Sequence, residues 1–389
     1  MNDIIYTRML AELIAFDTTS CRSNLPLIEY VETYLRDFDC RVERIAGETP
    51  DKVNLWVTIG PPDRSGYVLS GHSDTVPVDG QVWTSNPYQL RSADGRLYGR
   101  GAADMKGFLA VCLAHVPEMA AAPLLRPIHL AISCDEELGC RGVPSLLKEI
   151  SHRPVQPLGC FVGEPTRMAV VAGHKGSRRY RTTVHGSCAH TSLAPLHVNA
   201  IECAAQIVEE IRRTAGQIAT HWPQDPRYKV PYSTLLTTTI QGGTAINIVP
   251  GHCVMEWECR TIPADEASGI PESIMDFARN EILPGMRSKR DEAAIEFEQI
   301  STTLGLDTDD GHPLVQLAQS LNCDAGNSRR VQHVDFGSEA GLFDQAGIPS
   351  VVIGPGSIEQ AHKPDEYVEM TQLAACGRFV SGLIAACCR

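Results

Sequence analysis

Apolar residues in the first part of the chain alternate between a helical spacing and short continuous runs. The helical spacing predicts helices at residues 4–16, 27–38, 105–115 and 143–150. The short apolar runs predict strands at residues 53–58, 67–70, 128–133 and 158–162. Helices that alternate with short apolar strands are typical of a layered α/β domain built around one sheet.

The pattern changes after Lys175. Residues 178–185 alternate like a half-exposed strand, and residues 199–213 follow an amphipathic helical pattern. The next segments predict two strands, a helix and a last strand at residues 234–240, 246–260, 272–282 and 294–300. The order β-α-β-β-α-β is typical of a ferredoxin-like layer, with helices on one face of an antiparallel sheet. We therefore expect an inserted α+β domain at residues 177–300.

The α/β pattern resumes after this insertion. The spacing predicts two helices, two short strand-like runs and a final helix at residues 313–321, 339–346, 330–334, 350–353 and from Gln372 onward. The first domain is therefore interrupted and then completed, and we expect it to comprise residues 1–176 and 301–389.

The chain is acidic, with 34 Lys and Arg against 47 Asp and Glu and a formal net charge of −13. This excess of negative charge disfavours nucleic acids and anionic membrane surfaces as partners. The N-terminus lacks the pattern of a signal peptide, and no apolar run approaches the roughly 20 residues that span a bilayer. The 14 cysteines are scattered without CxxC pairs. We therefore expect a cytoplasmic protein with reduced thiols and with no nucleic-acid or membrane partner.

Side chains that bind metal ions lie at the ends of several predicted strands or, for Asp104, just before a predicted helix. They are His72, Asp74, Asp104, Asp135, Glu136, Glu137, Glu164 and His362. Each has an ordinary explanation by itself, such as a histidine paired with a nearby carboxylate, a helix N-cap, or a solvent-exposed acidic run. Loops at the carboxyl ends of parallel strands, however, meet over one crevice. We therefore expect these side chains to gather there.

The residue types in this group indicate the chemistry of the crevice. Two histidines and several carboxylates, without cysteines in a ligand spacing, suit zinc, or else cobalt or manganese. Crowded carboxylates repel one another unless water or cations neutralise them. We therefore predict a hydrolytic site with two divalent metal ions. GRGAADMKG departs from the GxGxxG of nicotinamide enzymes, and a GxSxG serine-hydrolase elbow is lacking.

These segments resemble the M20-type metallohydrolases. The similar segments, in family order, are GHSDTVP, YGRGAADMKG, SCDEELG, GEPT, HKG, GSEAGLF and GPGSIEQAHKPDE. The last segment is most similar to the acetylornithine deacetylases of this family. The resemblance implies a mixed-sheet α/β catalytic domain like that of zinc peptidases. It also implies that the inserted ferredoxin-like domain is a lid and a dimerisation domain.

The resemblance also implies a division of the metal ligands. His72, Asp104 and Glu164 would hold one metal ion. Asp104 would bridge to a second ion, held by Glu137 and His362. Spacing alone leaves open which of two adjacent glutamates, 136 or 137, is the ligand and which is the base, and the family assigns this.

Further roles follow from the same resemblance. Asp74 would orient His72, and Glu136 would be the general acid and base. His190 would stabilise the oxyanion, from the same chain or from a partner subunit, although by itself it resembles a surface histidine. The residues implied for substrate contact are Arg260, Asn247 and Glu339. A surface ion pair is an equally good explanation of Arg260.

The implied activity is removal of the acetyl group from N2-acetyl-L-ornithine, which gives acetate and L-ornithine. One alternative keeps the metal centre and changes the substrate to another N-acyl amino acid, succinyl-diaminopimelate or a dipeptide. A second alternative is a metal- or peptide-binding protein without turnover. Loss of the catalytic base would favour this second alternative, and Glu136 is intact.

Overall fold

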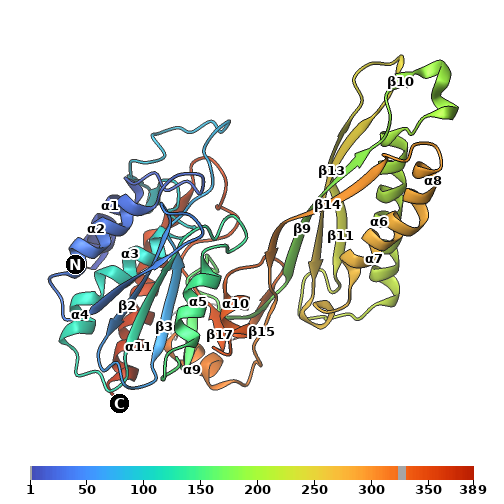
Figure 1. Cartoon of the computed structure of the whole chain (residues 1–389). Helices are drawn as coiled ribbons and strands as arrows, with labels where there is room; N and C mark the ends of the chain where they lie inside the picture. The colour runs from blue at the N-terminus through green and yellow to red at the C-terminus, as the bar shows by residue number, and fades with distance from the viewer. Residues whose placement is uncertain (1, 323–329) are drawn as a thin grey trace. The chain divides into compact units, whose positions relative to one another are not determined.

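The chain folds into two compact units, each built around its own large sheet (Figure 1). The computed structural model describes residues 2–322 and 330–389. The first unit comprises Met1–Gly173, Leu306–His333 and Ser338–Arg389, and the second comprises His174–Gly305 and Val334–Gly337. All the residues expected for the inserted domain, 177–300, lie in the second unit.

The sheet of the first unit has nine strands among the described residues. They are β1 Arg41–Ala46, β2 Val53–Ile59, β3 Tyr67–His72, β6 Ile128–Ser133, β7 Gly159–Val162, β8 Val171–His174, β15 Leu306–Asp307, β16 Gln332–Val334 and β17 Ser350–Val352. The order is β1-β2-β6-β3-β7-β17-β8-β15, and β16 pairs with β8. The neighbours β6, β3, β7 and β17 are parallel, whereas β1, β2 and β8 pair antiparallel. The expected mixed α/β sheet is therefore confirmed.

Helices cover both faces of this sheet. They are α1 Asn2–Ile14, α2 Leu25–Leu35, α3 Lys106–Ala114, α4 Val116–Ala121, α5 Val143–Ser151, α9 Pro313–Leu321, α10 Ala340–Gln345 and α11 Met370–Cys387. α1, α3 and α11 pack together in one core with strand residues such as Leu55, Leu69 and Phe161. α5 and α10 pack on β1, β2 and β17 outside that core. Burial of both faces explains why β6 and β7 are continuous apolar runs.

Helix α11 bears on the expectation that no apolar run approaches the length that spans a bilayer. By length and composition alone it is apolar enough to cross a membrane, with Arg378 interrupting its apolar residues. However, 44% of this segment is buried, and Leu373, Phe379 and Leu383 pack in the core of the first unit. We therefore interpret α11 as a core helix.

Several parts of the first unit were not predicted, including β8, β15 and α4. Strand β1 is a mostly exposed edge strand in which Ile45 alone is buried, so its sequence carries little apolar signal. Another such part is a small antiparallel sheet of β4 Arg91–Ala93, β5 Arg96–Tyr98 and β18 Tyr367–Glu369. Because β18 pairs with β5, the loop that precedes Tyr367 lies beside the loop that follows Tyr98.

The second unit has the expected ferredoxin-like order. Its sheet is antiparallel in the order β11-β13-β9-β14, with β9 Gly176–His185, β11 Thr234–Gly242, β13 His252–Thr261 and β14 Ala294–Thr303. Helices α6 Ala200–His221 and α7 Ile270–Phe277 pack on one face, and a π-helical turn leads from α7 into α8 Leu283–Arg287. Alternate residues of β13, including Met255 and Trp257, are buried under them.

The predicted strand at residues 246–260 is two strands. Pro250 and Gly251 separate β12 Ile248–Val249 from β13, because proline cannot donate a ladder hydrogen bond. β12 pairs with β10 Ala189–His190, which a 3-10 helix at Thr191–Leu196 follows.

Candidate metal centre

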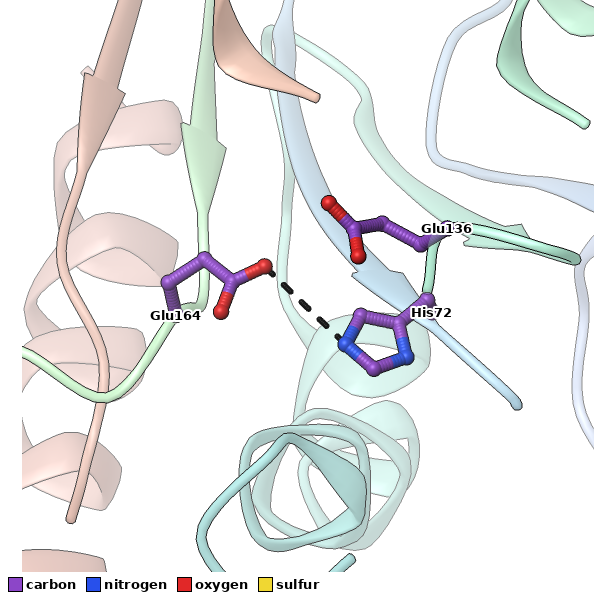
Figure 2. A group of neighbouring side chains, drawn as sticks. All are labelled: His72, Glu136 and Glu164. Atoms are coloured by element: carbon purple, nitrogen blue, oxygen red, sulfur yellow. Dashed lines mark ion pairs between the residues drawn. The ribbon is translucent and has the colours of Figure 1, made fainter. Parts of the chain in front are cut away.

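The candidate metal centre lies at the carboxyl ends of the parallel strands of the first unit. His72 is the last residue of β3, and Glu136 and Glu164 follow β6 and β7. Figure 2 shows these three side chains pointing toward one another. His362 lies in the loop after β17, and Asp104 lies just before α3. The crevice rule of parallel sheets therefore locates this group.

The ring of His72 is oriented with Nε2 toward the carboxylates. Its Nδ1 donates to the main-chain oxygen of Asp74 at 2.9 Å, because a carbonyl can only accept. Nε2 lies 3.0 Å from Oδ1 of Asp104 and 3.9 Å from Oε1 of Glu164. The imidazole is fully buried. Nε2 is therefore the ring atom available to a metal ion.

Asp74 orients its neighbours differently from the expectation. Its carboxylate lies 3.7 Å from Nδ1 of His72, which is farther than its own main-chain oxygen. The carboxylate instead accepts from the backbone N–H groups of Glu136 and Glu137, at 3.1 and 3.3 Å. It also accepts from the hydroxyl of Ser20 at 2.7 Å. Asp74 therefore fixes both the ring of His72 and the backbone of the two glutamates.

Asp104 lies between the two histidines. Its Oδ1 faces His72, and its Oδ2 lies 3.3 Å from Nε2 of His362. The same Nε2 lies 3.1 Å from Oε2 of Glu137. Asp104 is not the N-cap of α3, because that position is Met105. One oxygen toward each histidine is the arrangement that a bridging ligand requires.

The two adjacent glutamates have different partners. Glu137 contacts His362, whereas Oε1 of Glu136 accepts from the thiol of Cys140 at 3.3 Å. Potential ligand atoms lie within 4.8 Å of one another in two groups, which are His72 with Glu136 and Glu164, and His72 with Asp104 and Glu137.

The electrostatics of the group indicate a need for cations. Burial raises the pKa of Glu136 to about 8, and the charges of Glu137 and Glu339 add to this increase although His72 opposes it. Burial, together with the charge of Asp104, raises the pKa of Glu164 well above its usual range. Carboxylates in this position favour their neutral form unless positive charge is brought to them.

The pKa values of the two histidines are raised and that of Asp104 is lowered, so these groups favour their charged forms. Hydrogen bonds to Asp104 and Glu137 raise the pKa of His362 to about 10. Burial disfavours the charged ring of His72, yet Asp104 and Asp74 raise its pKa well above the usual value. Burial also opposes ionisation of Asp104, but hydrogen bonds from His362 and His72 hold its pKa well below the ordinary range. The protons on the imidazoles thus supply the positive charge that divalent cations would supply. The two histidines and the carboxylates around them fit two such ions.

The predicted oxyanion and substrate residues of the second unit fall into two places. His190 and Asn247 are exposed and adjacent, because His190 pairs with Ile248 and the N–H of Thr191 donates to the oxygen of Asn247 at 3.2 Å. Arg260 lies at the end of β13 and pairs with Glu258 at 3.0 Å. For Arg260 the structure thus contains the ion pair that the sequence offered as an alternative.

Glu339, which the sequence suggests for substrate contact, is bonded inside the first unit. It is fully buried just before α10, and its two oxygens accept from the hydroxyls of Ser70 and Ser133 at 2.5 and 2.7 Å. Burial raises its pKa. Both oxygens are therefore engaged inside the unit in this structure, and the substrate contact stays a prediction. Glu339 ties β3 to β6 beneath the cluster.

Sequence reasoning missed two residues that contact the group. Cys140 bonds to Glu136, and the carboxylate of Glu366 accepts from the backbone N–H of Asp104 at 3.0 Å. Glu366 is the last residue of the segment GPGSIEQAHKPDE, so its place in that motif was the available signal.

A cavity of about 440 Å³ lies elsewhere in the first unit. It is lined by residues of β1, β2, β6 and α5, including Trp56, His129 and Arg153. None of the predicted ligands lines it. The candidate site is therefore the side-chain cluster and not this cavity.

Comparisons with known proteins agree with this geometry. Residues 68–386 match the model of Peptidase family M20/M25/M40. The chain is 33% identical over 388 residues to a Myxococcus xanthus protein named acetylornithine deacetylase, covering 97% of this chain and 96% of that protein. Aminopeptidase PepT from Bacillus cereus has the same fold, with a TM-score of 0.76, 20% identity and 100% of both chains covered. The Bacillus subtilis YXEP protein, titled a dinuclear metal binding peptidase from the M20 family, gives a TM-score of 0.66 at 15% identity over 98% of each chain.

Proposed function

The chain belongs to peptidase family M20/M25/M40, and on this premise we propose that it removes the acetyl group from N2-acetyl-L-ornithine. The products are acetate and L-ornithine, a reaction of arginine biosynthesis. The cluster of two histidines and four carboxylates, of which His72, Asp104 and Glu164 are buried, carries the proposal for the chemistry. The relative named acetylornithine deacetylase, similar along nearly its whole length, supports the substrate.

The residues of the cluster suit two divalent ions, with zinc preferred over cobalt or manganese. His72, Asp104 and Glu164 would hold one ion, and Asp104, Glu137 and His362 the other. Such ions polarise an amide carbonyl and bring the pKa of a bound water down to roughly 7. The contact between Glu137 and His362 supports Glu137 as the ligand.

Glu136 is the proposed general base and acid. It takes a proton from the attacking water and returns that proton to the departing amine nitrogen, so the group ends each cycle unchanged. Its position supports this role, because Glu136 lies in the cluster and accepts from Cys140, whereas Asp104, Glu137 and Glu164 pair with the histidines. Its buried carboxylate, with a pKa raised to about 8, is able to hold a proton near neutral pH.

The second unit supplies the remaining proposed roles. We propose that His190 donates a hydrogen bond to the tetrahedral oxyanion, in its own chain or in a partner subunit, and that Asn247 and Arg260 contact the substrate. The adjacency of His190 and Asn247 supports a shared role for these two residues. We further propose a cytoplasmic homodimer formed through this unit.

Amine release from a panel of substrates tests the proposal. The metal-reconstituted protein is assayed with N2-acetyl-L-ornithine, N-succinyl-diaminopimelate, other N-acetyl amino acids and dipeptides, with the Glu136→Gln variant as the blank. We expect the highest kcat/KM with N2-acetyl-L-ornithine, and reversible loss of turnover on chelation. A preference for another member of the panel would contradict the substrate but not the amidohydrolase chemistry. Metal binding without turnover of any member would favour a binding protein.

A further inference from the structure

Glu366 is a fully engaged carboxylate behind the metal centre. Only 1% of it is exposed, and each oxygen accepts two hydrogen bonds. Oε1 accepts from the backbone N–H groups of Ala103 and Asp104, at 2.8 and 3.0 Å. Oε2 accepts from the N–H of Gly101 at 3.0 Å and from Nη1 of Arg100 at 2.7 Å. One side chain thus holds the loop that presents Asp104.

Arg100 extends the same contacts to the loop that carries His362. Its guanidinium is 1% exposed and lies over the ring of Trp83 at 5.0 Å. Nη2 donates to Oε1 of Gln81 at 2.7 Å, and Nη1 lies 3.4 Å from the main-chain oxygen of Lys363. Nε2 of Gln81 in turn donates to the main-chain oxygen of His362 at 3.0 Å.

These bonds form one continuous network. It runs from the backbone of Asp104 through Glu366, Arg100 and Gln81 to the backbone of His362. Among the described residues, the hydrogen bonds of this network reach Asp104 and His362 and do not include His72 or Glu164. The network therefore holds the main chains of Asp104 and His362, which are two of the three ligands proposed for the second ion. Of the ligands proposed for the first ion, it holds only Asp104.

We infer that Glu366 and Arg100 are positioning residues for the second metal ion. This inference rests on the two-metal site of the proposed function and adds residues that touch neither a metal ion nor a substrate. Glu366 and Arg100 hold the main chains of Asp104 and His362 at the spacing that the second ion needs. The first ion keeps His72 and Glu164, so its affinity depends less on the network.

Replacing Glu366 by Gln changes the network at constant size. The amide has one accepting oxygen and one NH₂ group, and the NH₂ group faces N–H donors whichever way the side chain turns. Changes in groups that support metal ligands typically weaken binding by about 10–100-fold. We expect this loss for the second ion, with the affinity for the first ion changed by less than about threefold.

The experiment titrates metal-free protein with Zn²⁺ and Co²⁺ and follows heat and the Co²⁺ absorption spectrum. The wild-type chain should bind two equivalents, whereas Glu366→Gln should bind one with wild-type affinity and one more weakly. Glu359→Gln is the matched control, because this glutamate lies in the same loop and its side chain is 70% exposed. It should titrate like the wild type.

Gln81→Ala keeps the inference testable if Glu366→Gln does not fold. It removes the link from Arg100 to the main chain of His362 without leaving a new carboxylate buried. Of the hydrogen bonds that this change removes, loss of the one to the main chain of His362 predicts about fivefold weaker binding of the second ion. Folding of each variant is checked by circular dichroism before titration.

Three results would overturn the inference. The first is that folded Glu366→Gln binds both ions with wild-type affinity. The second is that Glu366→Gln binds both ions more weakly to an equal extent. The third is that Gln81→Ala binds the second ion with wild-type affinity. The outcome is separable from that of the substrate panel. A wild-type chain that binds two ions without hydrolysing N2-acetyl-L-ornithine would contradict the substrate and leave the positioning roles intact. A wild-type chain that binds fewer than two ions would contradict the metal centre itself.

Discussion

The acidic side chains of the metal cluster in the first unit are largely buried, whereas those around Arg181 in the second unit are accessible to water. In the first unit, Asp104, Glu164 and Glu339 are at most 5% exposed, and the cluster meets its positive charge in the imidazoles of His72 and His362. In the second unit, Glu256 and Glu298 flank Arg181 on an accessible part of the sheet, at 2.9 and 3.1 Å. Water screens the second arrangement, whereas the first is stable in its charged form only with added cations. Burial, and not the number of acidic residues, therefore separates a metal site from a solvated surface.

Among the predicted effects, we expect the largest from replacing Glu136 in the first unit, which should lower kcat far more than replacing a glutamate of the second unit. Gln has the same size but cannot carry a proton between water and amine, so we expect kcat to fall by about 10²–10⁴-fold. Metal content and KM should stay near their wild-type values. Steady-state kinetics and metal analysis check this, with Glu256→Gln in β13 as the control that keeps full kcat. A Glu136→Gln enzyme within threefold of wild type would remove Glu136 from the mechanism.

Removal of the metal ions should destabilise the first unit. Ions that bind the folded state at about 100 times their Kd add about 2.7 kcal/mol to the free energy of unfolding per site. Hydrogen exchange with and without chelator measures the effect separately for each unit. We expect faster exchange in β3 and β6 and unchanged exchange in β11 and β13. Equal protection of the first unit in both conditions would contradict the idea that its carboxylates need cations.

His129 in β6 tests burial without a metal ion. Burial, with a smaller effect of Arg153, lowers its pKa from 6.5 to about 4. Between pH 6.5 and about 4, His129 is therefore protonated in the unfolded chain but not in the folded chain. The free energy of unfolding falls as the pH drops through this window. We expect a loss on the order of 2 kcal/mol, which His129→Gln should largely remove.

The comparison is made by urea unfolding of metal-free protein above and within the pH window. His152→Gln is the matched control, because this histidine is exposed at the C-cap of α5. The control should lose stability on acidification as the wild type does. If His129→Gln lost as much stability as His152→Gln, buried His129 would not be the group responsible.

The smallest effect is expected for the exposed ion pairs of the second unit. Arg181 and Glu256 are 42% and 33% exposed, and such pairs contribute about 0.2–1 kcal/mol. Glu256→Gln should therefore change the free energy of unfolding by less than about 1 kcal/mol and leave metal binding unchanged. Added salt should reduce even this difference. A larger loss would show that the acidic residues of the two units differ less than their burial indicates.

Local sequence pattern was sufficient where burial was uniform. The predicted strand at residues 128–133 is β6, and the predicted helix at 313–321 is α9, because both present clear apolar patterns. The metal cluster was also predictable, because its residues follow the ends of parallel strands. By contrast, β1 has one buried residue and gave too weak a pattern.

Long-range contacts explain what the sequence could not show. The hydrogen bonds of Glu339 are invisible to local sequence pattern, because its partners Ser70 and Ser133 lie 269 and 206 positions away. Glu366 was not singled out for the same reason, since Gly101 is 265 positions away. A local motif indicates that a carboxylate is present, but only the fold shows whether it faces a crevice or is bonded inside the unit.

The short segment Val334–Gly337 has a consequence for how the second unit could be exchanged between proteins. Lys175 donates its backbone N–H to Val334 and pairs with Asp335 at 3.0 Å, and Nη1 of Arg260 lies 3.3 Å from the oxygen of Asp335. This segment is separated from the main insertion by the 28 residues 306–333, since the insertion ends at Gly305. The second unit is therefore not a single cassette. Recombination that moves His174–Gly305 alone would leave behind four residues of the second unit, so the two units of this chain are expected to be inherited together.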